Sequence, residues 1–404
     1  MKVAIIHYWL VGMRGGEKVL EALCALFPDA DIFTHVLVPD AISDRLRAHT
    51  IKTTFINRLP RARYNYKTYL PLMPMALEQL DLRGYDLIIS SESGPAKGII
   101  PPPEGVHICY CHTPMRYIWN MYPEYRASAG VLARTSMPFL THYLRSWDQC
   151  TAARVDGFVA NSRSVAARIQ KYYRRSSTVV HPPVDVESFD LLPADDIGDF
   201  YLMVGELVAY KRPDLAVRAF NASGKKLVVI GGGDMLPAIR QLAGPSVEVL
   251  GPQPFERLRA YYAQCRALIF PGEEDFGIVP VEAMASGRPV VAFGRGGVLD
   301  SVVDGVTGVL FEEQSEESLL DAVARSERLH FNAPSIKAHA QQFNAQRFAR
   351  QMRAVIQEQI VRQKGATWLS DEAMPSRLPA VDVFEPHLDV VPSIGGRSQR
   401  HKAL

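Results

Sequence analysis

The sequence is poor in three features that often reveal a protein's class: excess charge, cysteine and long hydrophobic runs. Its 404 residues carry a formal net charge of only +2, so composition gives no support to nucleic-acid binding. The cysteines form an odd and scattered set, which is consistent with a reducing compartment: Cys24, Cys109, Cys111, Cys150 and Cys265. No apolar run reaches the roughly 18 residues of a membrane span, and Met1-Lys2 leads straight into a predicted strand without a signal peptide. These features predict a cytoplasmic protein that binds no nucleic acid.

Two signatures of bound cofactors are also missing. No G-x-G-x-x-G follows a predicted strand, and no acidic residue ends a convincing second strand, which argues against a nicotinamide dinucleotide. The stretch from Cys109 to His112, "CYCH", has poor spacing for zinc because no second cluster accompanies it. We therefore expect neither a dinucleotide nor a metal.

Short apolar segments alternate with helical patterns along most of the chain. In the first half these segments include "KVAIIHYWL", "DLIISSES", "HICYCHTP" and "DGFVANS", and Ser162 is expected to cap the helix that begins near Arg163. After a proline-rich stretch at 181–198 the second series contains "FYLMVGEL", "KLVVIGGG", "VEVLGP", "ALIFPG" and "PVVAFGRGG". Strands that alternate with helices form parallel sheets, so we predict two doubly wound α/β domains, with ligands beyond the carboxyl ends of the strands.

The chain is too long for one ordinary core. The predicted divisions are an N-terminal domain at 1–185, a C-terminal domain at 186–345, a closing helix at 346–364 and a disordered tail at 365–404.

Two stretches are suited to binding phosphate. Gly15 and Gly16 open the first helix, where bare backbone amides form a phosphate cradle, although a pair of turn glycines has the same appearance. In the second half, Lys211 and Arg212 stand between a strand and a helix that has Pro213 in its first turn. An ammonium beside a helix N-terminus suits a diphosphate, whereas the plain alternative is a solvated charge pair.

The stretch "FPGEEDFGIVPVEAMASG" places two carboxylates around a junction between a loop and a helix. Glu274 precedes a helix predicted at 278–286, and Glu282 lies one turn inside it. The amides of Phe276, Gly277 and Ile278 are expected to point into the same space. Carboxylates accept hydrogen bonds from hydroxyls and amides donate to their oxygens, so the stretch favours a polyhydroxylated ligand. The alternative is that Glu274 only complements the helix dipole and Glu282 faces water.

Taken together, the two glutamates with seven residues between them, the Gly-Gly helix start, Lys211, "CHTPMR" and "VVHPPVD" resemble retaining glycosyltransferases of the GT-B fold, family 4. The resemblance covers roughly residues 1–362 and implies two Rossmann-like domains that face a central cleft. The stretches "EEDFGIVPVEAMASGRPVVAFGRGG" and "HTPMRYIWNMY" look most like bacterial mannosyltransferases that build exopolysaccharide or O-antigen units from GDP-mannose.

The resemblance also implies roles for these residues. Glu274 would hold the donor sugar and Glu282 the ribose, while Lys211, with Gly15 and Gly16, would stabilise the leaving diphosphate. His112 would lie close to the sugar and the acceptor; a histidine that ends an apolar strand is otherwise often a core residue. Transfer would proceed by front-face substitution without a metal ion, since no DxD-type cluster ends a strand.

One position departs from the family's pattern. Glu206 stands where the family commonly has an arginine that partners the lysine at the diphosphate. Arg212 is the candidate substitute, although its position next to Lys211 predicts that its side chain points elsewhere. The departure keeps open a catalytically silent GT-B protein that acts as a membrane-assembly subunit. A transferase with a UDP-sugar donor, a nucleotide-sugar epimerase and a phosphorylase are further alternatives.

A basic and aromatic stretch at 45–69 indicates where an acceptor would be reached. It concentrates Arg45, Arg47, Lys52, Arg58, Arg61, Arg63 and Lys67 with Phe55, Tyr64, Tyr66 and Tyr69. Such a surface suits an anionic bilayer, although a solvated basic loop is the plain alternative. We expect a polyprenyl-diphosphate-linked acceptor and peripheral attachment to the inner face of the plasma membrane.

Overall fold

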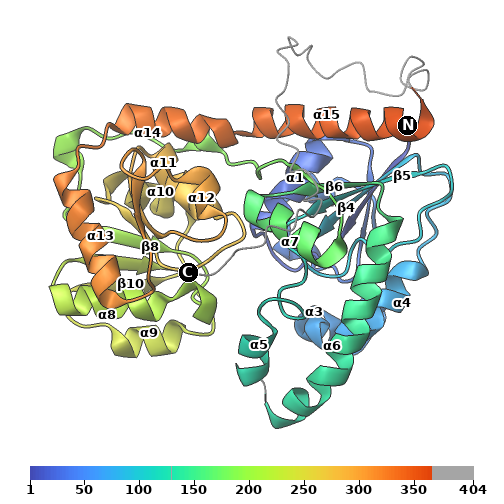
Figure 1. Ribbon diagram of the computed structural model, residues 1–404, viewed down its shortest axis with the longest axis horizontal. Coiled ribbons are helices and arrows are strands. Elements are labelled where there is room, and N and C mark those ends of the chain that lie inside the picture. The colour runs from blue at the N-terminus through green and yellow to red at the C-terminus, as the bar shows by residue number, and fades with distance from the viewer. Residues whose placement is uncertain (129, 366–404) are drawn as a thin grey trace, which may run out of the picture. The chain divides into compact units, whose positions relative to one another are not determined.

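The computed structural model describes residues 1–128 and 130–365, and it divides the chain into two α/β units (Figure 1). Unit 1 comprises residues 1–180 together with the described residues from Gln351 on, and unit 2 comprises residues 181–350. The predicted domain divisions were 185 and 345. The predicted disordered tail lies outside the described residues, apart from Gly365.

Unit 1 is built on a parallel sheet with the strand order β3-β2-β1-β4-β5-β6-β7. The strands are β1 (Val3–His7), β2 (Asp31–Thr34), β3 (Ile51–Thr53), β4 (Leu87–Glu92), β5 (Val106–Cys111), β6 (Gly157–Ala160) and β7 (Thr178–Val179). Every residue of β1, β4 and β5 is buried, as expected for parallel strands covered on both faces. The chain order reverses between β1 and β4, which places the carboxyl ends of these strands at a switch point.

The helices of unit 1 cover this sheet. They are α1 (Gly15–Leu26), α2 (Asp44–Arg47), α3 (Ala62–Asn65), α4 (Met73–Glu78), α5 (Tyr122–Ser128), α6 (Val131–Thr151), α7 (Arg163–Tyr173) and most of α15 (Ala345–Lys364). On α1 the apolar residues Val19, Leu20, Leu23 and Leu26 are buried. Ser162 caps α7 as predicted, because its hydroxyl accepts a hydrogen bond from the Val165 amide at 3.1 Å.

Unit 2 repeats the plan with the strand order β10-β9-β8-β11-β12-β13. Its strands are β8 (Tyr201–Val204), β9 (Leu227–Ile230), β10 (Val247–Gly251), β11 (Leu268–Phe270), β12 (Val290–Phe293) and β13 (Gly308–Phe311). Its helices are α8 (Pro213–Ser223), α9 (Leu236–Leu242), α10 (Phe255–Gln264), α11 (Ile278–Ala285), α12 (Val298–Ser301), α13 (Glu316–Arg328) and α14 (Ala333–Ala340). All its strand pairs are parallel.

Alternate residues of the unit 2 strands pack into two separate hydrophobic cores, one on each face of the sheet. Leu202, Leu268 and Val290 pack on one face with residues of α10, α11 and α14. Met203 and Ile269 pack on the other face with residues of α8, α9 and α13. Figure 1 shows these two groups of helices on opposite sides of the sheet. The prediction of two doubly wound α/β domains is therefore confirmed.

Candidate functional site

The switch point of unit 2 brings two of the predicted residues into contact. Lys211 follows β8 and Glu274 follows β11, the strand next to β8 in the sheet. Lys211 Nζ lies 2.9 Å from Glu274 Oε1, and the two side chains are only 16% and 17% exposed. Glu274 Oε1 makes no hydrogen bond of good geometry among the described residues, so the contact is a close ion pair rather than an aligned hydrogen bond. A cation and a carboxylate therefore lie side by side where the sheet's ligand is expected.

Electrostatics keep Lys211 charged. Burial alone would lower the pKa of Lys211, but the carboxylates of Glu274 and Glu206 help to outweigh it, and the pKa is raised. Glu206 therefore acts on this same ammonium. The lysine is a fixed positive charge that already faces negative charge before any ligand arrives.

Glycines make the close packing around Glu274 possible. A Cβ on Gly272 would lie 2.5 Å from the Lys211 Cα, and a Cβ on Gly296 would lie 2.4 Å from the Glu274 carbonyl oxygen. The Glu274 carbonyl accepts a hydrogen bond from the Gly297 amide at 2.9 Å. The loop that carries Glu274 is thus held between two other backbone segments and is pre-positioned.

The other predicted residues of unit 2 surround the start of α11. Gly277 is its N-cap with a φ of +87°, a conformation that favours glycine, and Ile278 is its first residue. Phe276 is buried in the core beneath this turn. Glu282 lies one turn into α11, and its Oε2 accepts a hydrogen bond from the Tyr262 hydroxyl at 2.8 Å. Glu282 therefore does not simply face water.

The guanidinium of Arg212 is paired with Asp214 rather than with Glu274. It caps α8 with a φ of +52°, and its guanidinium donates to both carboxylate oxygens of Asp214, at 3.1 and 3.2 Å. Asp214 also accepts from Arg218 at 2.7 Å. A contact between Arg212 and the donor remains a prediction, and this geometry gives it no support.

In unit 1, the carboxyl ends of three neighbouring strands hold polar side chains. His7 ends β1, Ser91 is the penultimate residue of β4, and His112 follows β5. Ser91 Oγ lies 2.9 Å from His112 Nε2 and 3.1 Å from His7 Nδ1. His112 is half-buried, whereas His7 and Ser91 are buried. His112 is therefore held in place by its neighbours rather than extended into solvent.

Gly15 and Gly16 form the first turn of α1, as predicted. A Cβ on Gly16 would lie only 2.3 Å from the Tyr8 hydroxyl, so packing alone gives a reason for glycine at this position. The predicted meeting of these glycines with Lys211, and the predicted central cleft, involve both units and remain predictions.

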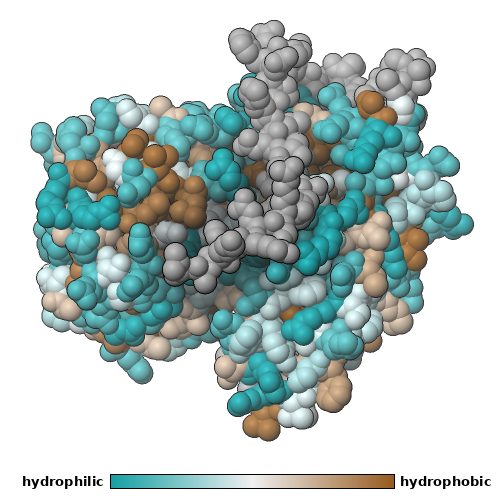
Figure 2. Space-filling model, in the orientation of Figure 1, coloured by the Kyte–Doolittle hydropathy of each residue, from teal (hydrophilic) through white to brown (hydrophobic). Residues whose placement is uncertain are grey.

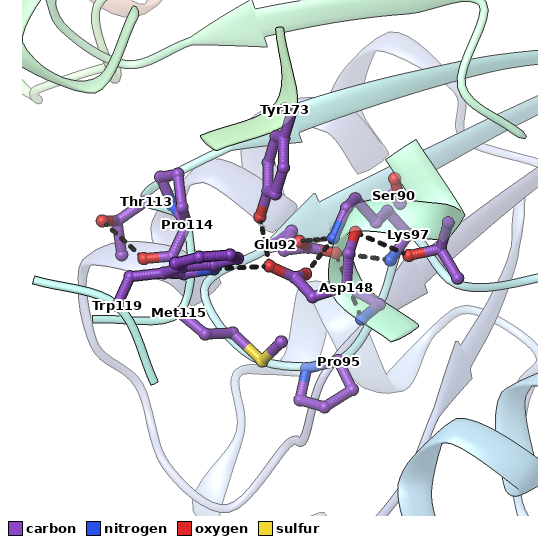
Figure 3. Close-up of polar contacts among 12 residues, drawn as sticks. Ser90, Glu92, Pro95, Lys97, Thr113, Pro114, Met115, Trp119, Asp148 and Tyr173 are labelled. Carbon is purple, nitrogen blue, oxygen red and sulfur yellow. Dashed lines mark hydrogen bonds and ion pairs between the residues drawn. The ribbon is translucent and has the colours of Figure 1, made fainter. Parts of the chain in front are cut away.

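Unit 1 contains a fully buried ionic cluster, shown in Figure 3, that the sequence did not indicate. Lys97, Glu92 and Asp148 are each 0% exposed. Lys97 Nζ lies 2.9 Å from Glu92 Oε1 and also contacts Asp148 Oδ1. The other Asp148 oxygen accepts from Trp119 Nε1 at 2.7 Å and from the Tyr173 hydroxyl at 2.9 Å.

The ionic cluster fixes the segment that carries His112. The Glu92 carbonyl accepts a hydrogen bond from the His112 amide at 2.7 Å, and Trp119 ties the end of the following loop to Asp148 on α6. Trp119 also stacks on Tyr172, with ring centroids 4.6 Å apart. The "CHTPMRYIW" stretch is consequently anchored at both ends by buried polar groups.

The described part of the chain offers neither a cluster of metal ligands nor a membrane-spanning helix. Across 1–128 and 130–365, no group of three or more His, Cys, Asp and Glu side chains is arranged to hold a metal ion. In the same ranges no helix combines the length and the apolar character needed to cross a bilayer.

Comparison with known proteins agrees with this architecture. The family model "Glycosyltransferase Family 4" matches residues 13–188, and the model "Glycosyl transferases group 1" matches residues 185–342. A D-inositol 3-phosphate glycosyltransferase of Nocardiopsis dassonvillei is 30% identical over 227 residues, which cover 48% of this chain and 52% of the relative. An uncharacterised glycosyltransferase of Methanocaldococcus jannaschii is 26% identical over 173 residues, covering 42% and 48%. The chain thus spans about half the length of these curated relatives.

Solved structures share the fold over nearly the whole chain. Sucrose-phosphate synthase from Thermosynechococcus elongatus matches with a TM-score of 0.68 and 17% identity, covering 90% of this chain and all of that one. Anabaena HepE in complex with UDP matches with a TM-score of 0.65 and 16% identity, covering 89% and 100%. The chain is therefore a GT-B protein whose two units are similar to family 4 and group 1 glycosyltransferases.

Proposed function

We propose that the protein is a retaining glycosyltransferase that moves a sugar, with mannose from GDP-mannose as the favoured donor, to a polyprenyl-diphosphate-linked glycan. The observation that carries the proposal is the contact between Lys211 and Glu274 at the switch point of unit 2. A sugar diphosphate presents hydroxyls next to an anion, so a carboxylate beside an ammonium matches both parts of it. The family models support a transferase in both units.

The proposed reaction needs stabilisation of the leaving group more than a nucleophile. The bond between the anomeric carbon and the diphosphate breaks, the acceptor oxygen attacks from the same face, and the acceptor proton passes to a diphosphate oxygen. Lys211 and the amides at the start of α11 would stabilise the negative charge that develops. Glu274 would hold sugar hydroxyls, Glu282 the ribose, and His112 the sugar close to the acceptor. None of these steps requires a metal ion.

A donor screen tests this proposal. We expect GDP-mannose to raise the melting temperature of the full-length protein more than UDP-glucose or UDP-N-acetylglucosamine does. At equal concentration the donor that binds most tightly stabilises the folded state most, and a ligand at 100 times its Kd stabilises it by about 2.7 kcal/mol. Analysis of products with and without acceptor separates transfer from epimerisation and phosphorolysis. Transfer should persist in EDTA. A preference for a UDP-sugar would show that GDP-mannose is the wrong donor. A loss of transfer in EDTA that only magnesium restores would show that Lys211 is not the main stabiliser of the leaving group.

Glu206 supports a second candidate function. Its carboxylate acts on Lys211 where the family commonly has a cation, which would weaken the binding of a diphosphate. A catalytically silent GT-B subunit is the corresponding alternative. Absence of donor binding by calorimetry for every sugar nucleotide tested would favour it over the transferase.

The acceptor would be reached through a basic and hydrophobic surface of unit 1. Its cations Arg58, Arg61, Arg63 and Lys67 are all exposed. Of the predicted aromatic residues, Tyr64 is 85% exposed, whereas Tyr66 is buried and Phe55 and Tyr69 pack in the cluster beneath. Leu70 joins this segment to Leu140 and Leu144 of α6, where Phe139 is 81% exposed. Figure 2 shows hydrophobic surface at the end of unit 1 where α6 begins.

We expect this surface to bind anionic vesicles. Each cation near such a bilayer contributes roughly 1 kcal/mol, so the triple variant Arg58/Arg61/Arg63→Ser should bind about 100-fold more weakly at low salt. Sedimentation with vesicles that contain phosphatidylglycerol measures the change. The triple variant Lys226/Arg240/Arg257→Ser removes the same charge from exposed positions of unit 2 and should bind like wild type. Equal binding by the two variants would show that this surface of unit 1 does not attach the protein to the bilayer.

A further inference from the structure

A chain of four polar side chains leads from α1 to His112, and the proposed reaction uses only its last member. Glu17 Oε1 lies 3.6 Å from His7 Nε2, which is ion-pair distance. His7 Nδ1 lies 3.1 Å from Ser91 Oγ, and Ser91 Oγ lies 2.9 Å from His112 Nε2. Glu17, His7 and Ser91 are 2%, 1% and 0% exposed. Packing alone does not explain them, because burying a carboxylate and an imidazole costs stability relative to apolar side chains.

The sheet itself brings these side chains together. His7 and Ser91 are register partners on β1 and β4, the two strands between which the chain order reverses. His112 follows β5, the neighbour of β4. Glu17 is fixed from the other side, since its Oε2 accepts a hydrogen bond from the Arg14 amide at 2.9 Å. The chain therefore joins the start of α1 to the edge of the sheet where a ligand is expected.

The hydrogens of this chain have two consistent arrangements. His7 Nε2 faces a carboxylate and carries a hydrogen in both. When His7 is neutral, its Nδ1 accepts from the Ser91 hydroxyl, Ser91 Oγ accepts from His112 Nε2–H, and the lone pair of neutral His112 is on Nδ1. When His7 is protonated, its Nδ1–H donates to Ser91 Oγ and the hydroxyl turns to donate to His112 Nε2. The hydrogen of neutral His112 is then on Nδ1.

The carboxyl and phenol groups packed against His7 and His112 are each held in one charge state. Burial alone would raise the pKa of Glu17, but the imidazole of His7, 3.6 Å away, and the hydrogen bond from the Arg14 amide outweigh it and lower the pKa, so Glu17 stays a carboxylate. Tyr8 lies against His7, with ring centroids 4.1 Å apart, and burial together with Glu17 raises its pKa. Tyr110, which faces His112 with ring centroids 5.2 Å apart, is also kept neutral because burial raises its pKa. Histidine is the residue that changes charge at physiological pH.

We propose that the charge of His7, supported by Glu17 and transmitted through the Ser91 hydroxyl, selects which ring nitrogen of His112 carries the hydrogen. Glu17, His7 and Ser91 are positioning residues in this arrangement. One buried protonation converts His112 Nδ1 from an acceptor to a donor and so changes how it can hold a sugar hydroxyl. The consequence for transfer rests on the proposed function, whereas the link between the two histidines does not.

Ring-nitrogen chemical shifts of ¹⁵N-labelled histidine in the full-length protein test the link. As pH is varied from about 5.5 to 8.5, a window that spans ordinary histidine titration, His112 should show two inflections, its own and one shared with His7. In Ser91→Ala the shared inflection should disappear from His112. Ser90→Ala is the matched control: Ser90 is equally buried on β4, and its Oγ lies 2.9 Å from Nε2 of another histidine, His107.

Ser90→Ala should leave both inflections of His112 in place. A single inflection for wild-type His112, or two for Ser91→Ala, would overturn the proposal. Glu17→Gln tests the same link without touching Ser91, because the amide oxygen still accepts from the Arg14 amide. It should move the shared inflection to lower pH, because it removes the carboxylate that favours a charged imidazole, and an unmoved inflection would count equally against the link.

Kinetics separate this proposal from the proposed function. Ser91→Ala should lower kcat about 10-fold and change the donor KM by less than about twofold, and Ser90→Ala should change neither. If the shared inflection is found as expected but wild type transfers no sugar from any donor, the link stands and the function fails. If wild type transfers sugar while Ser91→Ala keeps wild-type kinetics and titration, the link alone is wrong.

Discussion

Replacing Glu274 with alanine is expected to lower kcat about 100-fold or more without weakening the binding of free GDP. The sugar gains positive charge as the diphosphate leaves, so a carboxylate at its hydroxyls binds the transition state more strongly than the ground state. A 100-fold loss corresponds to about 2.7 kcal/mol, within the range for a charged hydrogen-bond partner. GDP has no sugar to lose, and Lys211 would be released from the ion pair at 2.9 Å to face the diphosphate.

Replacing Glu282 with alanine is expected to affect donor binding rather than the rate of transfer. For Glu282→Ala the lost contact lies at the ribose and falls equally on ground and transition states, so the donor KM should rise roughly 10-fold or more while kcat changes little. Free GDP should bind this variant more weakly. Tyr262→Phe is the matched control, because it removes the hydroxyl that donates to Glu282 at 2.8 Å and keeps the carboxylate.

Steady-state kinetics and calorimetric titration with GDP measure both patterns. Glu274→Gln keeps the shape of the side chain and removes its charge, and it separates the loss of charge from the loss of packing beside Lys211. A reversed pattern, with Glu282 controlling kcat and Glu274 controlling GDP affinity, would exchange the assigned roles. Full activity in both folded variants would remove the two glutamates from the site.

Replacing Lys97 with methionine is expected to destabilise the protein by about 3–5 kcal/mol. The change leaves Glu92 and Asp148 buried without their shared cation, and removing one member of a buried ion pair costs that much. Denaturant unfolding would measure it. Lys52→Met is the matched control: Lys52 pairs with Asp31 at 2.8 Å but is 47% exposed, so its loss should cost no more than about 1 kcal/mol.

The pH dependence of this variant has a definite sign. In wild type, burial alone would lower the pKa of Lys97, but Asp148 and Glu92 outweigh it and raise the pKa, so the stability Lys97 contributes is lost only at alkaline pH. Burial raises the pKa of Glu92. Without Lys97 no cation opposes that effect, so the folded variant favours the protonated acid, and its stability should fall as pH rises above about 4.5.

Lys97→Met should therefore recover part of its lost stability near pH 5 relative to pH 8. Wild type should recover less over the same interval, because Lys97 opposes the rise in the pKa of Glu92. If the variant has the wild-type free energy of unfolding at both pH 5 and pH 8, Glu92 and Asp148 can be buried together without Lys97. The ionic cluster would then contribute little to stability.

Local patterns predicted those parts of the molecule that local chemistry determines. The helix predicted at 278–286 is α11, because Pro280 is tolerated only in a first turn and Gly277 supplies the conformation before it. Ser162 was predicted as a cap because a serine hydroxyl at that position satisfies an amide of the first turn. Long apolar strands such as β4 were predicted for the same kind of reason. Short strands such as β7, with two residues, carry too little pattern to be recognised.

Contacts between distant residues could not be predicted in this way. Lys97 and Asp148 are 51 positions apart, and nothing in their spacing indicates that the segment after β4 and helix α6 bring them together. The pairing of Lys211 with Glu274 depends on β8 and β11 being neighbours, a consequence of sheet order that the sequence does not display. No role for His7 follows from the sequence, because its partners Glu17 and Ser91 are recognised only when β1 and β4 lie in register.

The route of the chain through the two units also determines the order in which they can fold during synthesis on the ribosome. Unit 2 is one uninterrupted stretch, whereas unit 1 is completed by the last part of α15, where Ile356 and Ile360 are buried and Gln359 lies against Gly157. At roughly 5–20 residues per second, unit 1 waits about 10–40 s for this helix after residue 180 has been made. During that interval the apolar surface that Ile356 and Ile360 cover in the folded unit would be open to water, so we expect chaperones to bind nascent unit 1, whereas unit 2 can fold as soon as it is complete.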